Sequence, residues 1–297
     1  MDNKLSLQKW IDEASADGGI SLGEYCLRQQ AGELGMSEEG VLDRMEAALG
    51  VMEAAVNDGL KGRLSSSGLV GDNGAKMRRA IQSGGSKLLG TIPVTAVMMS
   101  LAAAESNACM GRIVAAPTAG SSGVLPGVLF AIAADRGFGR RQLAMGLVTA
   151  GAVGMVIASR ATLSGAEGGC QAECGAAAAM AAGAVVDLYG GSPCQVGDAV
   201  AIALKNMLGL VCDPVAGLVE VPCVKRNAGA AVQGLAAAEM ALCGISSAIP
   251  VDEVIDAMAS VGRCMPHGLR ETSEGGLAMT GTGRSIARGL CHGHDMG

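Results

Sequence analysis

The sequence predicts a mainly α-helical protein: a single compact helical domain over residues 1–297, with functional loops rich in glycine and proline and little or no sheet. Apolar residues make up 49% of the chain but aromatic residues only 2%, so the core must be built from small aliphatic side chains, helped by 46 glycines. Small side chains let helices pack closely. The β-branched alternation of strands is rare, and no repeat or low-complexity linker divides the chain.

The helices can be placed in order along the chain. Residues 1–60 form an N-terminal helical region, in which Ser37, two glutamates and a periodic apolar run predict a capped helix up to Val56. A polar Gly/Ser-rich loop follows over residues 61–74, a length that is often functional. Residues 284–297 are expected to be a flexible tail. The remaining expected helices are Val94–Glu105, Leu143–Thr162, Ala176–Leu188, Asp198–Leu208, Ala228–Leu242 and Asp252–Val261.

Charge and hydropathy narrow the class of protein. The net charge of −6 gives no basic surface, so no nucleic-acid partner is expected. The mean hydropathy of +0.37 raises the question of a membrane span, and Gln142–Ser159 is uncharged and just long enough. Because this stretch is rich in alanine and glycine, a buried core helix is favoured and no membrane partner is expected. The N-terminus has no secretory pattern, so the protein is expected to be cytoplasmic.

Of the ten cysteines, Cys170, Cys212 and Cys223 are singled out as candidate metal ligands because of the glycine and proline around them. Cys170 follows two glycines at an expected helix start, where a helix dipole favours the thiolate. Cys212 and Cys223 open and close a loop that carries a proline near each end. Their spacing does not match structural zinc sites, whereas iron–sulfur clusters tolerate irregular spacing. Five other cysteines are interpreted as core filler: Cys26, Cys109, Cys194, Cys243 and Cys264.

Two further segments supply candidate substrate-binding residues. The loop after Pro117 offers backbone N–H groups and hydroxyls suited to a carboxylate, although a plain turn of small residues would look the same. Its candidate residues are Thr118, Gly120, Ser121 and Ser122. Asn73 and Lys76, which follow the Gly/Ser-rich loop, are candidates for holding the carboxylate or the surroundings of an amino group.

Long strings of this sequence resemble the iron–sulfur L-serine dehydratases, specifically the α chain of the two-subunit form. The resemblance runs from about Ser67 to Ala278, and its strongest strings are Ala115–Pro126, Glu167–Gly175, Lys205–Cys223, Val221–Asn227 and Leu269–Gly276. It implies that Cys170, Cys212 and Cys223 hold a [4Fe–4S] cluster. Cys174 is excluded because relatives differ at this position.

The resemblance also implies a reaction. A cluster held by three thiolates leaves one iron open as a Lewis acid, which would polarise the hydroxyl of L-serine during its conversion to pyruvate and ammonia. The general base is not evident, because the three histidines, His267, His292 and His294, lie in positions better explained as surface or tail. Single-chain relatives carry an additional domain with a histidine-bearing motif, so a separate β subunit is the expected source of the base.

Several alternatives stay open at this stage. A cysteine desulfidase with the same kind of cluster would release sulfide instead of water. A pyridoxal-phosphate lyase would use the segment Gly84–Lys87 and the loop Gly120–Gly123, but no doubly wound α/β pattern surrounds them. The alternative that is not an enzyme is a scaffold or membrane protein built largely from small residues. Cys291 either caps the open iron reversibly or belongs to a disordered end.

Overall fold

The structure, a computed structural model, describes residues 4–86 and 88–293. Within these residues the chain forms helices joined by loops and short helical turns, without a strand; one isolated bridge pairs Cys212 with Arg270. The helices are α1 Leu7–Ala16, α2 Leu22–Leu34, α3 Glu38–Gly59, α4 Asn73–Gln82, α5 Thr91–Ala108, α6 Val124–Arg136, α7 Arg140–Arg160, α8 Gly165–Gly168, α9 Ala176–Leu188, α10 Pro193–Met207, α11 Cys223–Leu242, α12 Val251–Cys264 and α13 Gly281–Gly293. The predicted mainly α fold is confirmed.

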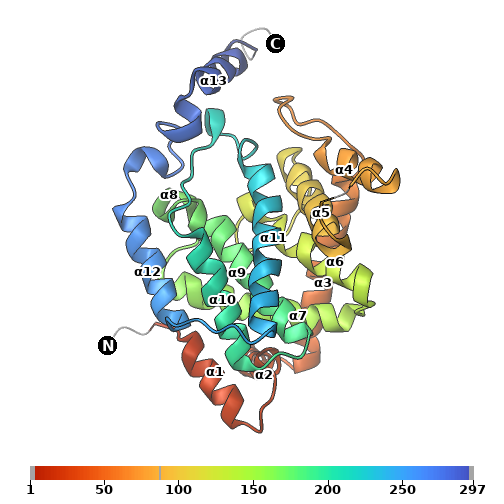
Figure 1. The fold of residues 1–297 in the computed structure, drawn as a ribbon, viewed down its shortest axis with the longest axis vertical. Coiled ribbons are helices and arrows are strands. Elements are labelled where there is room, and N and C mark those ends of the chain that lie inside the picture. Colours follow the sequence, from red (N-terminus) through yellow and green to blue (C-terminus); the bar gives the residue numbers. More distant parts are fainter. Residues whose placement is uncertain (1–3, 87, 294–297) are drawn as a thin grey trace.

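Helix α9 is the centre of the fold. All of its residues from Ala176 to Asp187 are buried, and it packs against α7, α10, α11 and α6. Around this core, α5 packs on α3, α6 and α11, while α12 and α1 pack on α10 (Figure 1). Helix α13 lies at the end of the molecule opposite α1 and α2 (Figure 1). The helices therefore form one compact domain around an alanine-rich central helix.

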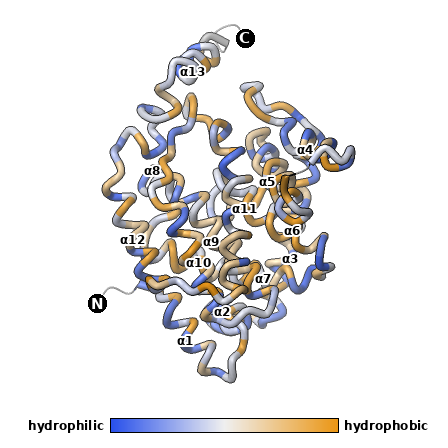
Figure 2. The backbone as a smooth tube through the Cα atoms, in the orientation of Figure 1, coloured by the Kyte–Doolittle hydropathy of each residue, from blue (hydrophilic) through white to orange (hydrophobic). Residues whose placement is uncertain are grey.

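Glycine and alanine allow the helices to approach as closely as the composition predicted. A Cβ atom added at Gly59 of α3 would lie 1.8 Å from the carbonyl oxygen of Ala102 on α5. One added at Gly234 of α11 would lie 2.8 Å from the carbonyl oxygen of Ala178 on α9. Figure 2 shows hydrophobic residues in the central helices, with hydrophilic residues more frequent toward the periphery. Small side chains thus take the place of aromatic ones in filling the core.

Some elements differ from the sequence-based expectation. The Ser37 cap is confirmed, since its hydroxyl accepts a hydrogen bond from the backbone N–H of Gly40. Helix α6 was not expected, but Pro126 lies in its first turn, where the missing N–H costs nothing. Residues 284–293 of the expected tail belong to helix α13, at whose start the Thr280 hydroxyl accepts a hydrogen bond from the N–H of Gly283; residues 294–297 lie outside the described part of the chain.

Helix α7 contains the uncharged stretch that raised the membrane question. Among the described helices it alone is long and apolar enough to cross a membrane, judged by length and composition. However, 67% of that stretch is buried inside the protein, where α7 packs against α9, α3 and α2. The burial agrees with the expectation of a core helix.

Candidate active site

The segment that carries Cys170 is held beside the segment that carries Cys212. Gly169 adopts a positive φ of 74°, and the chain then enters one π-helical turn, Gln171–Gly175, that leads into α9. Gln171 is fully buried; its backbone N–H donates to the carbonyl of Leu210 at 3.0 Å, and its side-chain oxygen accepts from the N–H of Gly209 at 2.9 Å. Cys170 therefore stands at a helix start, as predicted, next to the chain entering Cys212.

The loop from Cys212 to Cys223 doubles back on itself. Cys212 is bridged on one side to the 269–271 segment, with its N–H donating to Leu269 and its carbonyl accepting from Glu271. The loop then turns at Ala216, which has a positive φ of 56°, and the N–H of Val215 donates to the carbonyl of Val221 at 2.9 Å. Cys223 follows as the first residue of α11. The loop therefore reverses direction between Cys212 and Cys223.

The three predicted ligand thiols are buried and influence one another. Cys170, Cys212 and Cys223 are 3%, 3% and 9% exposed. Burial, together with the charges of Cys170 and Glu173, raises the pKa of Cys223 to about 12, and burial and neighbouring negative charges, including Cys170 and Cys223, also raise the pKa of Cys212. A hydrogen bond from the Cys174 thiol lowers the pKa of Cys170. Hydrogen bonds also connect the three segments. Glu173, three residues after Cys170, accepts from the Cys212 thiol. Arg226, three residues after Cys223, donates to the residues on both sides of Cys212.

The three thiols do not form a site for a single metal ion. Among the described residues, no group of three or more His, Cys, Asp or Glu side chains is positioned to hold one metal ion. In an iron–sulfur cluster each cysteine binds a different iron, so the thiols need not converge on one atom. Cys170, Cys212 and Cys223 are buried thiols on separate segments, which is the type of donor that an iron–sulfur cluster takes.

Glu173 joins the thiols to the predicted substrate loop, and sequence reasoning missed it. Its carboxylate accepts a hydrogen bond from the Thr118 hydroxyl at 2.8 Å, and its other oxygen lies 3.9 Å from the Cys212 sulfur, which donates to it. Burial, opposed by the Thr118 hydrogen bond, raises the pKa of Glu173. Glu173 lies within the string Glu167–Gly175, so the signal was an acidic residue between two cysteines of a glycine-rich segment.

The loop over residues 118–123 is fastened to the helix that begins with Cys223. The fully buried Asn227 donates from its side-chain nitrogen to the carbonyls of Gly120 and Cys223, at 2.7 and 2.9 Å, and its oxygen accepts from the N–H of Gly123. Ser121 is buried and bonded to Thr118, whereas the buried Ser122 hydroxyl has no hydrogen-bond partner among the described residues. Asn227, a further residue that the sequence did not single out, thus ties the loop to the thiols.

Asn73 and Lys76 lie in different surroundings from that loop. The side-chain amide and backbone N–H of Asn73 both donate to Glu105, a carboxylate that is only 1% exposed. The Lys76 ammonium is exposed and lies 3.7 Å from Asp72. Both residues line a cavity of about 350 Å³ with Lys225, two residues after Cys223. Within the described residues, no hydrogen bond connects either of them to the cysteines or to Thr118.

The other candidate groups lie at the surface or outside the described residues. The His267 side chain is exposed and lies 3.5 Å from Glu274. Cys291 is exposed on α13, where it lines a cavity of about 480 Å³ together with Glu220 from the cysteine loop. Lys87, the lysine of the pyridoxal-phosphate alternative, and His294 lie outside the described residues, as does the side chain of His292. The described part of the fold contains no sheet of the kind that alternative requires.

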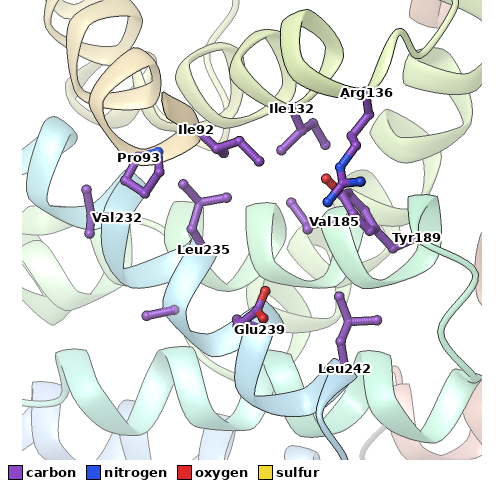
Figure 3. Close-up of a pocket in the computed structure, with 11 residues that line it drawn as sticks. Ile92, Pro93, Ile132, Arg136, Val185, Tyr189, Val232, Leu235, Glu239 and Leu242 are labelled. Atoms are coloured by element: carbon purple, nitrogen blue, oxygen red, sulfur yellow. The ribbon is translucent and has the colours of Figure 1, made fainter. Parts of the chain in front are cut away.

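A separate apolar cavity of about 370 Å³ lies far from the thiols. It is enclosed by α5, α6, α9 and α11, with Ile132 and Leu235 among its lining residues and Arg136 beside Tyr189 at one end (Figure 3). Leu235 is twelve residues along α11 from Cys223, or about 18 Å at 1.5 Å per residue. No cysteine lines this cavity, so it is not part of the candidate active site.

The fold and the site define an all-helical protein in which buried thiols from separate loops gather beside a loop of small polar residues. Residues 17–278 match the family model described as "Serine dehydratase alpha chain". The chain is 50% identical over 280 residues to a "Probable L-serine dehydratase, alpha chain" of Bacillus subtilis, covering 94% of this chain and 93% of that protein. It is 40% identical to the "L-serine dehydratase, alpha chain" of Peptoniphilus asaccharolyticus, covering 96% and 97%.

A longer relative matches over part of its length. The "L-serine dehydratase" of Mycobacterium tuberculosis is 46% identical over 187 residues, which is 61% of this chain and 41% of that protein. Since the family model spans most of the chain and two relatives match along nearly their whole length, the chain belongs to the serine dehydratase alpha-chain family.

Proposed function

We propose that this chain is the iron–sulfur subunit of an L-serine dehydratase, which converts L-serine to pyruvate and ammonia. The proposal is carried by one observation: Cys170, Cys212 and Cys223 are buried neighbours, and Glu173 connects them to the Thr118 loop. In the proposal these three thiolates hold a [4Fe–4S] cluster. When bound, the cluster supplies an open iron that acts as a Lewis acid on the substrate hydroxyl.

The chain's own residues would bind and orient the substrate. The Thr118–Gly123 loop presents backbone N–H groups to the carboxylate of L-serine, while the Thr118 hydroxyl donates its hydrogen bond to Glu173. Glu173 fixes the direction of that hydroxyl, and Asn227 fixes the loop relative to Cys223. Asn73 and Lys76 remain candidates for contacts at the edge of the site. Loss of the Cα proton and of the hydroxyl as water gives aminoacrylate, whose hydrolysis yields pyruvate and ammonia.

A separate β subunit completes the site in this proposal. Relatives named as alpha chains match this chain over 93% and 97% of their lengths, whereas it matches only 41% of the longer M. tuberculosis relative. The longer relative therefore contains a stretch that does not align with this chain, and in the proposal a separate β subunit supplies its counterpart. We assign the general base to the β subunit, and the cytoplasm as the location, since a reducing compartment keeps free thiols available for iron.

The proposal is tested by reconstituting the chain with iron and sulfide under anaerobic conditions. Pyruvate formation from L-serine is then measured with and without the β subunit, with L-cysteine as the competing substrate. Activity on L-serine that requires both subunits and is abolished by iron chelation supports the proposal. Faster sulfide release from L-cysteine would favour the desulfidase instead, and activity without iron would contradict the proposal.

A further inference from the structure

Arg226 lies one turn after Cys223 on α11 and binds the chain on both sides of Cys212. One guanidinium nitrogen donates to the carbonyl oxygen of Val211 at 2.8 Å, and the other donates to the carboxylate of Asp213, also at 2.8 Å. The side chains of Arg226 and Asp213 are 17% and 3% exposed. A planar guanidinium is suited to such a two-point contact. The Cys212 segment is therefore held against the helix that carries Cys223.

Asp213 extends this arrangement to a third segment. Its second carboxylate oxygen accepts a hydrogen bond from the backbone N–H of Leu277 at 2.8 Å. A Cβ added at Gly276 would lie 2.3 Å from the same oxygen, so the turn packs directly on this carboxylate. Both oxygens of Asp213 are thus used, and the position of the residue after Cys212 is fixed from two directions.

Arg226 also brings a positive charge to two of the ligand segments. Its guanidinium lies on α11, three residues after Cys223, and contacts the residues on both sides of Cys212. Buried negative charges need a partner to be tolerated. A guanidinium held between the Cys212 segment and the helix that carries Cys223 provides one.

We infer that Arg226 is a positioning residue for the metal site, which holds the Cys212 segment against α11 and offsets the negative charge of the thiolate-ligated cluster. This inference rests on the proposed function. The two roles are separable, because lysine at this position keeps the charge but cannot form both hydrogen bonds, whereas glutamine loses the charge. Groups that support metal ligands typically change affinity or activity by roughly 10- to 100-fold when removed.

The experiment compares Arg226→Gln, Arg226→Lys and the wild-type chain after anaerobic reconstitution. Arg44→Gln, at an exposed position on α3, is the control for losing one positive charge. Iron and sulfide content, the reduction potential of the cluster and the rate of cluster loss in air are measured, and thermal unfolding of the metal-free proteins monitors the fold.

Arg226→Gln should lose the cluster in air roughly 10- to 100-fold faster than wild type, with a more negative reduction potential. Arg226→Lys should keep a reduction potential close to that of wild type but still lose the cluster faster. If Arg226→Gln does not fold, the comparison of Arg226→Lys with wild type tests the inference. Cluster content and air stability within about twofold of the Arg44→Gln control, together with the same reduction potential as that control, would overturn the inference alone. A wild-type chain that takes up no iron would overturn the proposed function as well.

Discussion

The hydrogen bond between Thr118 and Glu173 is the direct connection between the substrate loop and the thiol-bearing segments, and its strength can be measured. The two oxygens lie 2.8 Å apart and join residues 55 positions apart in the chain. Hydrogen bonds to charged groups contribute about 1.5–3 kcal/mol net. Because both side chains are only half-buried, we take the lower end of that range, about 1.5 kcal/mol, which is roughly a tenfold change in an equilibrium constant.

A double-mutant cycle isolates this contribution. Thr118→Val removes the donor, Glu173→Ala removes the acceptor, and the double variant corrects for the cavity and for the lost contact to Cys212. Urea unfolding of the metal-free chain at pH 8 gives the free energy of unfolding of each form. In the reconstituted enzyme, Thr118→Val should also raise the KM for L-serine, because the loop loses its fixed orientation.

The chain contains a matched control pair of the same chemistry. The Thr162 hydroxyl donates to the carboxylate of Glu167 at 2.6 Å, but this pair is exposed, so water replaces the lost partner. The cycle Thr162→Val with Glu167→Ala should give a coupling of about 0.5 kcal/mol or less. If the coupling between Thr118 and Glu173 is no larger than that of the control, the loop is not held in the way we describe.

Three further predictions concern burial and packing. Burial raises the pKa of Asp187 in the folded state, so folding favours its protonated form. Asp187 therefore adds most to the free energy of unfolding below its unfolded pKa of about 3.9, and this contribution declines as the pH rises through the higher folded pKa. Urea unfolding over a pH series should therefore show Asp187→Asn gaining stability relative to wild type as the pH rises, and a constant difference would contradict this. Gly59→Ala should lower the free energy of unfolding by about 3 kcal/mol, because its Cβ would meet the backbone of Ala102. Gly32→Ala, at a position that faces open space, should raise it by about 0.5 kcal/mol. Equal effects of the two variants in urea unfolding would refute the close contact. Native alkylation at pH 8, followed by peptide mass spectrometry, should spare Cys26, whose pKa burial raises to about 12, and labelling of Cys26 as fast as the surface thiols would contradict its burial. The exposed thiols expected to react are Cys194, Cys243, Cys264 and Cys291.

The elements predicted well from the sequence are those specified by local patterns. Ser37 and the glutamates after it form a helix start within four residues, and the alanine run from Ala176 to Leu188 has no alternative to a helix. Helix α6 was missed because its start is decided by distant contacts: Gly123 and Gly127 lie against the backbone of Ser100 on α5. Such contacts leave no local pattern in the sequence.

The candidate site likewise contains residues that local sequence patterns mark and residues that they do not mark. Cys170, Cys212 and Cys223 could be selected because glycine and proline around them mark loops. Asn227 and Glu173 could not, because their roles come from partners such as Gly120, which is 107 positions from Asn227 in the chain. A buried polar side chain is recognised only when its hydrogen-bond partners are known. The fold supplies those partners, and the sequence does not.

The most direct test of the account is the iron and sulfide content of single cysteine variants after anaerobic reconstitution. The wild-type chain should hold about four irons and four sulfides, as its cluster type requires. Serine at position 170, 212 or 223 should remove most of both, whereas Cys174→Ser and Cys264→Ser should retain them. Full iron and sulfide in any of the first three variants, or their loss in the Cys264→Ser control, would contradict the assignment of Cys170, Cys212 and Cys223 as the ligands.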